Sequence, residues 1–169
     1  MAKLASLVLV AVLLAACAGP QPSLYAPLES GDGYAEVALP KGLYRVTFQG
    51  NLATSRERAE TYVLYRAAEL TLDLGAESFV VHDKLTERLT RVTRDWTHGP
   101  FGYAGYRFRA HRYGPSNVIE RETTTYRAHL TIEPFSGSPP SEGFQRHEAR
   151  AVVDRLAGEI RRPSEAAGN

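Results

Sequence analysis

The residues best suited to chemistry in this 169-residue chain are its single cysteine and its five histidines. The histidines are scattered: they are His82, His98, His111, His129 and His147. No pair of them combines the i, i+4 spacing with a third ligand, as a zinc site requires. The chain also lacks a phosphate-binding glycine loop and the Gly-x-Ser-x-Gly sequence that exposes a catalytic serine. We therefore predict no metal site, no cofactor and no enzyme activity, with a catalytic site assembled from distant residues as the alternative.

The cysteine, Cys17, stands at the end of a short apolar run. Residues 4–16 are apolar except for one serine, they follow the positive charge of Lys3, and they are too few to cross a bilayer. This pattern predicts an export signal over residues 1–16. Residues 14–17, Leu-Ala-Ala-Cys, resemble the lipobox of bacterial lipoproteins, where cleavage precedes the cysteine and its thiol carries a diacylglycerol. The resemblance implies that Cys17 is the lipidation site.

A lipidated Cys17 would place the protein in the bacterial cell envelope. Two or three acyl chains hold a protein durably on a membrane, whereas one chain holds it weakly. Ala18 occupies the position where the enteric sorting rule places a retention aspartate. The resemblance therefore implies the periplasmic face of the outer membrane. The competing interpretation, a small buried apolar cysteine, is disfavoured by the preceding apolar run and the Gly-Pro-rich stretch that follows.

The composition indicates one domain without disulfides. Lysine and arginine number 20 and aspartate and glutamate 19, so bulk attraction to nucleic acid is not expected. If Cys17 carries lipid, no cysteine is left for a disulfide, and packing must stabilise the domain. We expect a flexible tether over 17–32, rich in Pro, Ser and Gly, a single domain over 33–163 and a disordered tail over 164–169.

Hydrophobic patterning predicts an antiparallel sheet of four strands. Short β-rich runs at 34–39 and 43–49 flank a Pro-Lys-Gly turn and predict a hairpin. Longer alternating segments at 78–94 and 118–133 predict a second hairpin whose outer half extends beyond the core. In the last of these segments, Tyr126, Ala128, Leu130 and Ile132 share the face that we expect to be buried.

Two helices complete the predicted α+β fold, in the order ββαββα with both helices on one face. A capping-box sequence begins the first, over 55–74, and Gly75 ends it. Apolar spacing predicts the second over 145–161. The first helix has a core stripe (Ala59, Val63, Ala67, Leu70, Leu74), a second apolar side (Leu64, Tyr65, Ala68, Leu72) and a narrow polar strip (Tyr62, Arg66, Glu69, Asp73). We expect the second helix to cover the second side, and Arg66 and Glu69 to form a local helical ion pair.

Three motifs add a more specific resemblance. They are 33–36 (GYAE), 44–51 (YRVTFQGN) and 65–75 (YRAAELTLDLG). Together with the lipobox they resemble an uncharacterised family of small bacterial envelope lipoproteins, over about half of the chain that follows the signal. The resemblance implies an envelope lipoprotein and supplies no catalytic residue, substrate or cofactor.

The insert over 95–117 is the candidate partner surface. From Lys84 to Arg112 there are seven basic residues and two acidic ones, in an otherwise neutral chain. Aromatic residues and arginine are enriched at binding hot spots, although a mobile tip without a specific role explains the composition equally well. The candidate residues are Trp96, Phe101, Tyr103, Tyr106, Arg107, Arg109 and Arg112.

These patterns favour a noncatalytic module, anchored through Cys17, that binds an envelope protein or a cell-wall polymer through the insert. The envelope location excludes a nucleic-acid partner. Two alternatives stay open: a hydrolase acting on the cell wall, and a structural lipoprotein that oligomerises through the helix at 55–74.

Overall fold

The computed structural model describes residues 19–29, 31–97, 117–138, 140 and 144–163. Its elements are, in chain order, β1 (Gly33–Ala38), a short 3-10 turn (Pro40–Gly42), β2 (Tyr44–Gln49), α2 (Arg56–Asp73), β3 (Ser78–Thr97), β4 (Asn117–Phe135), β5 (Gln145–Glu148), α3 (Ala149–Leu156) and a second 3-10 turn (Ala157–Glu159). No helix in these ranges is long and apolar enough to pass through a membrane.

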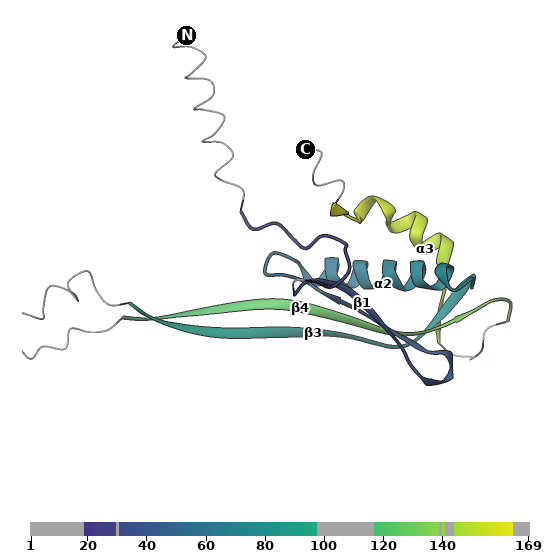
Figure 1. The fold of residues 1–169 in the computed structure, drawn as a ribbon, viewed down its shortest axis with the longest axis horizontal. Helices are drawn as coiled ribbons and strands as arrows, with labels where there is room; N and C mark the ends of the chain where they lie inside the picture. The colour runs from purple at the N-terminus through teal and green to yellow at the C-terminus, as the bar shows by residue number, and fades with distance from the viewer. Residues whose placement is uncertain (1–18, 30, 98–116, 139, 141–143, 164–169) are drawn as a thin grey trace, which may run out of the picture.

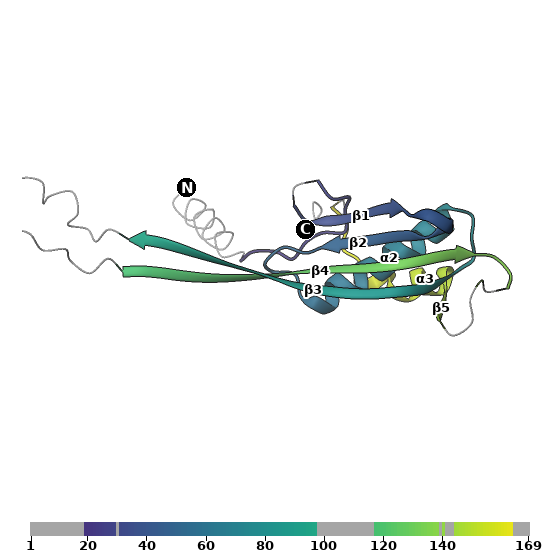
Figure 2. The same cartoon turned by 90° about the horizontal axis from the view of Figure 1, so that it is seen from below.

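The strands form one antiparallel sheet in the order β1-β2-β4-β3-β5, and both helices lie on one face of it (Figures 1 and 2). The predicted α+β class is therefore confirmed. The predicted number of strands is wrong, because residues 145–148 pair with residues 78–81 of β3 and add a fifth strand. The predicted helix over 145–161 is accordingly shorter, and α3 begins at Ala149.

Local sequence signals define α2 well. Its N-cap is Ser55, whose hydroxyl accepts a hydrogen bond from the Arg58 amide (3.2 Å). At the other end Gly75 has φ = 76°, its amide donates to the Leu72 carbonyl (2.9 Å) and the Ala76 amide donates to Thr71 (3.0 Å). This pair of bonds is a Schellman motif, which satisfies carbonyls that the helix end leaves free. The observed helix lies within one residue of the predicted range at each end.

The core lies between the sheet and the two helices. Ala128, Leu130 and Ile132 of β4 are buried against α2, as their alternation predicts. The second side of α2 packs against α3, which contributes Val152 and Leu156 to the same core. The predicted covering of α2 by the second helix is thus confirmed.

Two residues of the helix predicted over 55–74 are not where their predicted side would place them. Tyr62, expected on the polar strip, is fully buried, and its ring packs edge-on against Phe48 with 4.9 Å between centroids. Its hydroxyl remains satisfied because it accepts from the Arg161 amide (3.1 Å). Leu74, expected in the core, is 46 % exposed because the helix ends before it.

The long hairpin extends well past the rest of the sheet (Figures 1 and 2). Strand β2 pairs only with residues 127–132 of β4, and β5 only with residues 78–81 of β3. Residues 88–97 and 117–126 therefore pair only with each other, over ten residue pairs. At about 3.3 Å per residue this two-stranded ribbon is about 30 Å long. We call it the arm.

The tether predicted over 17–32 is wrong for the part that the structure describes. Ser23 and Tyr25 are only 3 % and 2 % exposed. The Tyr25 amide donates to the Arg161 carbonyl (2.7 Å), and the Leu28 amide to the Tyr34 carbonyl (2.7 Å). Prolines exclude a helix or a central strand here, but they permit an extended chain that packs on the domain through side chains and a few backbone bonds.

Gly33 allows this packing. Its φ is 128°, and a Cβ at this position would lie 2.6 Å from the Ala26 carbonyl oxygen. Any side chain would therefore push the N-terminal segment, residues 19–28, away from β1. This close approach is a structural reason for the glycine that begins the 33–36 motif.

Candidate functional site

Most of the predicted site residues cannot be placed. The candidates Cys17, Phe101, Tyr103, Tyr106, Arg107, Arg109 and Arg112 lie outside the described residues, as do the predicted signal over 1–16 and tail over 164–169. Trp96 lies on β3 near the end of the arm, paired with Val118. The described residues contain two features from which function can be argued: a buried polar cluster and the arm.

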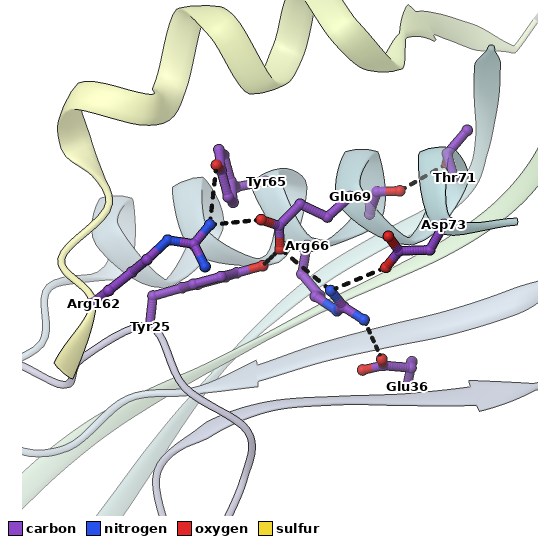
Figure 3. Close-up of polar contacts among 9 residues, drawn as sticks. Tyr25, Glu36, Tyr65, Arg66, Glu69, Thr71, Asp73 and Arg162 are labelled. Atoms are coloured by element: carbon purple, nitrogen blue, oxygen red, sulfur yellow. Dashed lines mark hydrogen bonds and ion pairs between the residues drawn. The ribbon is translucent and has the colours of Figure 1, made fainter. Parts of the chain in front are cut away.

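The polar cluster is centred on the Glu69 carboxylate of α2 (Figure 3). One carboxylate oxygen accepts from Arg162, with Nη2 at 2.7 Å, and the other accepts from the Tyr25 hydroxyl and from Arg66 Nη1 at 3.2 Å. Arg66 also binds Glu36 on β1, with Nη2 2.6 Å from Oε1. We call Tyr25, Glu36, Tyr65, Arg66, Glu69, Asp73 and Arg162 the Glu69 cluster.

The cluster joins four separate parts of the chain. Tyr25 comes from the N-terminal segment, Glu36 from β1, Arg66 and Glu69 from α2, and Arg162 from the chain after α3. We predicted Arg66 and Glu69 as an isolated helical pair worth a few tenths of a kcal/mol. The predicted pair is present (3.2 Å), but it is not isolated, because it is the centre of a network in which the Arg66 side chain is only 14 % exposed.

Aromatic rings enclose the charged groups. The Tyr25 ring packs against Tyr34, Tyr62 and Tyr65, with centroids 4.8, 5.6 and 5.2 Å away. The Arg66 guanidinium lies 4.8 Å from the Tyr34 centroid, and the Arg162 guanidinium 5.2 Å from that of Tyr25. Such contacts place the positive charges over electron-rich ring faces, so the same residues that bury the cluster also stabilise its cations.

The electrostatics of the cluster do not suit acid–base catalysis. Burial opposes ionisation of Glu69, but hydrogen bonds from Tyr25 and Arg162 outweigh it and lower the Glu69 pKa below its ordinary value. Burial, together with the hydrogen bond to Glu69, raises the Tyr25 pKa far above its ordinary value. Both groups are therefore moved away from neutrality, whereas a general acid or base works best with a pKa near the operating pH. The arrangement is that of a structural clamp.

A second set of hydrogen bonds holds the N-terminal segment farther along. The Ser23 hydroxyl accepts from the Asn51 amide (2.8 Å) and from Thr54 Oγ1 (2.9 Å), and the Ser23 amide donates to Thr54 Oγ1 (2.9 Å). Asn51 Nδ2 also donates to the Gln21 carbonyl (2.9 Å). The segment is therefore fixed from Gln21 onwards, at the loop between β2 and α2.

The two faces of the arm differ in charge. On the face that continues the helix side of the sheet, Arg94 Nε lies 2.6 Å from Glu120, and Arg88 Nη2 lies 3.9 Å from Glu122. On the other face Arg91 is opposite Thr123, and Arg121 is opposite Thr93. Neither Arg91 nor Arg121 has an ion pair within the described residues. One face is neutralised by its own pairs. The other carries Arg91, Arg121 and Asp95, and two positive charges against one negative charge give it a net charge of +1.

Sequence reasoning missed Tyr25, Glu36 and Arg162 as members of the cluster. They lie up to 137 positions apart, so no local spacing could have joined them. One signal was available: Tyr25 is the only aromatic residue in the Pro-rich stretch before Gly33. A large aromatic side chain in an otherwise small and polar segment is a candidate for burial.

The first prediction concerns the Tyr25 hydroxyl. We expect Tyr25→Phe to lower the free energy of unfolding by about 1–3 kcal/mol, because a buried carboxylate loses a donor. Tyr25→Ala should cost about 3–5 kcal/mol, since the ring is lost as well. Urea unfolding measures both changes. Tyr44→Phe is the matched control, because the Tyr44 hydroxyl has no hydrogen bond within the described residues. Equal stability of Tyr25→Phe and the wild type would contradict the clamp.

The second prediction concerns pH. Because folding lowers the Glu69 pKa, ionised Glu69 stabilises the fold above its ordinary pKa of about 4.5, and this contribution is lost as pH falls through the lower folded value. Glu69→Gln should therefore cost about 1–3 kcal/mol at neutral pH and progressively less below pH 4.5. The measurement is the free energy of unfolding against pH.

Asp73→Asn is the control for this experiment. Asp73 lies 3.5 Å from the same arginine, Arg66, but its side chain is 62 % exposed. We expect a change of less than about 0.5 kcal/mol, because exposed ion pairs contribute little. A Glu69→Gln effect as small as this, or one that does not depend on pH, would show that the carboxylate is not the centre of the cluster.

Within the described ranges no group of three or more His, Cys, Asp or Glu side chains is arranged to hold a metal ion. Comparison with protein-family models, with curated proteins and with solved structures found no match. Function must therefore be argued from the clamp and the arm themselves.

Proposed function

We propose that this protein is a lipid-anchored, noncatalytic module of the bacterial envelope, which binds a protein or cell-wall partner through the arm and the Arg/aromatic insert 95–117 that the arm presents. The observation that carries this proposal is the arm itself: ten residue pairs that extend from the sheet with no third strand paired to them. Isolated two-stranded hairpins are marginally stable in water. A long uncovered ribbon with arginine and aromatic residues at its end is best explained as a contact surface.

The clamped N-terminal segment supports the anchoring part of the proposal. Gln21, whose carbonyl is bound by Asn51, lies only four positions after Cys17. This stretch spans at most about 14 Å when fully extended. An acylated Cys17 would therefore hold the domain close to the membrane, where the predicted longer tether would have allowed it to move freely.

The described N-terminal segment begins at the same end of the domain as the arm. The Gly50 amide, one residue before Asn51, donates to the Tyr126 carbonyl (2.9 Å) at the base of the arm. The module would accordingly present its arm from the membrane-proximal end of the domain. Partners within about the length of the arm from the membrane surface are the ones that it would reach.

The two alternative functions, a structural oligomer and a cell-wall hydrolase, have less support from the described residues. Oligomerisation through the helix at 55–74 was suggested by its two apolar sides, and these pack against the sheet and α3. A hydrolase requires convergent titratable groups with pKa values suited to catalysis. The pKa shifts in the Glu69 cluster run in the opposite sense.

The anchor is tested by the substitution Cys17→Ser. In the native host we expect the wild-type protein to be found in the membrane fraction with a diacylglycerol on Cys17, as measured by mass spectrometry of its N-terminal peptide. The variant should lack the lipid and leave the membrane fraction, because a serine hydroxyl does not replace the thiol. A wild-type Cys17 without lipid would contradict the anchoring proposal.

The arm is tested by replacing residues 98–116 with Asn-Gly, which suits a two-residue hairpin turn. We expect the envelope cross-links of the wild-type protein to be lost, while the melting temperature stays within a few degrees because the core is untouched. A variant with Arg107, Arg109 and Arg112 all changed to Gln keeps the length and the aromatic residues, and separates the contribution of charge. Unchanged cross-links in both variants would remove the insert as the partner surface.

A further inference from the structure

The base of the arm has a free strand edge. Strand β2 ends at Gln49, and the last backbone bond on that side of β4 is from the Gly50 amide to the Tyr126 carbonyl (2.9 Å). Among the described residues, none pairs with 117–125 on this edge. In an antiparallel strand the N–H and C=O of one residue point to the same side, and successive residues alternate. The Tyr126 carbonyl points to the free edge, toward Gly50. The N–H and C=O groups of every second residue before it, Thr124, Glu122 and Glu120, therefore point to the same edge.

A groove of about 580 Å³ lies beside this edge, on the face of the sheet away from the helices. One wall is formed by the turns at Gly31–Asp32 and Asn51–Leu52, and the other by β3 and β4, with Arg91, Thr125 and Arg127 among its lining residues. Leu89 and Thr90 of β3 also line it, so the groove reaches across the base of the arm. The β4 edge thus has open hydrogen-bonding groups beside a groove.

The charges on this face indicate the occupant. Arg91 and Arg121 have no ion pair within the described residues, and the acidic residue of the arm on this face is Asp95, opposite Ile119. Arg127 is already engaged, because its Nη2 donates to Gln49 (2.6 Å) and it lies 3.9 Å from Glu87. Asp32 is the only acidic side chain that lines the groove within the described residues. An added strand directs alternate side chains to this face at intervals of about 6.8 Å. Acidic side chains at those alternate positions would meet the arginines.

We infer that the β4 edge at the base of the arm binds an extended acidic segment of a partner protein, which adds to the sheet as a strand antiparallel to β4 and in line with β2. The inference rests on the proposed function, because it specifies how the arm holds its partner. The outward N–H and C=O groups of Thr124 and Glu122 bind the backbone of the segment, and Arg91 and Arg121 bind its carboxylates.

A second copy of this chain fits the edge less well. Two copies paired through their β4 edges about a two-fold axis perpendicular to the sheet would place their open faces on the same side. The arginines of one open face would then lie next to those of the other, and like charges across neighbouring strands are destabilising. A segment that carries carboxylates would instead place opposite charges next to these arginines.

The decisive experiment compares prolines on the two edges of the arm. Thr124 lies on β4, and Val92 lies on β3 opposite Glu122; by the alternation above both amides face outward, on opposite edges. Proline removes an outward N–H and is tolerated at a strand edge. Thr124→Pro therefore blocks the β4 edge, and Val92→Pro is the matched control, because Val92 does not line the groove. The full acylated protein in detergent micelles is titrated with a synthetic peptide of alternating Thr and Glu. We expect Thr124→Pro to weaken binding at least about tenfold, and Val92→Pro to change it less than about twofold.

Charge variants test the same edge without a change to the backbone. Arg121→Glu should weaken binding of the Thr-Glu peptide, whereas Arg94→Glu, on the neutralised face, should not. A peptide of alternating Thr and Lys should not bind. Equal effects of Thr124→Pro and Val92→Pro, or equal effects of Arg121→Glu and Arg94→Glu, would overturn the inference. Two further results would overturn it. One is self-association of the protein that Thr124→Pro abolishes. The other is binding of polygalacturonate, a carbohydrate polyanion, that is tighter than binding of the Thr-Glu peptide and is unchanged in Thr124→Pro.

Envelope cross-links distinguish this inference from the proposed function. If the cross-links survive replacement of residues 98–116 but are lost in Thr124→Pro, the edge is the binding site and the insert is not. If they are lost on that replacement but survive Thr124→Pro, the edge inference fails while the proposed function stands. If the edge and the insert bind one partner together, we expect the cross-links to be lost in both variants and to be kept in Val92→Pro.

Discussion

The Glu69 carboxylate is the contact on which the arrangement of the chain depends most. It accepts hydrogen bonds from Tyr25, Arg66 and Arg162, so one charged group connects the N-terminal segment, α2 and the chain after α3. A partly buried carboxylate is stable only while its donors are present, and the removal of one leaves charge that is inadequately solvated. The aromatic rings around the cluster exclude water and make this requirement stricter. The ends of the domain are therefore held to its helix by interactions that depend on one another.

These contacts determine where the N-terminal segment leaves the domain. With Tyr25 held by the cluster and Ser23 held by Asn51 and Thr54, the chain leaves the domain at the loop between β2 and α2. That loop is also the base of the arm, through the bond from Gly50 to Tyr126. A domain on a flexible tether could take many orientations, whereas one clamped a few residues from its expected anchor has few. The clamp thus relates a membrane anchor to the direction in which the arm is presented.

What the sequence predicts well here is what neighbouring residues determine. The cap at Ser55, the Schellman end at Gly75 and the alternation of β4 are local patterns, and each has its expected place in the structure. The strand β5 was missed because residues 145–148 become a strand only by pairing with β3. The Glu69 cluster was missed for the same reason, because Tyr25 and Arg162 meet α2 only after the sheet and helices have formed. Prolines around Tyr25 indicated an irregular segment, and irregularity does not distinguish a packed segment from a loose one.

The contacts that hold the arm together lie within the arm itself. The pairs Arg94–Glu120 and Arg88–Glu122, and the bonds from Thr123 to the Arg91 carbonyl (3.1 Å) and from Thr93 to that of Arg121 (3.3 Å), are all internal. These contacts need no partner, so the proposed strand edge would be formed before binding, and less conformational entropy would be lost on association. Arg91 and Arg121 contribute no ion pair to the arm within the described residues. They lie on one face, beside an open edge and a groove, where the proposed acidic segment would complement their charge.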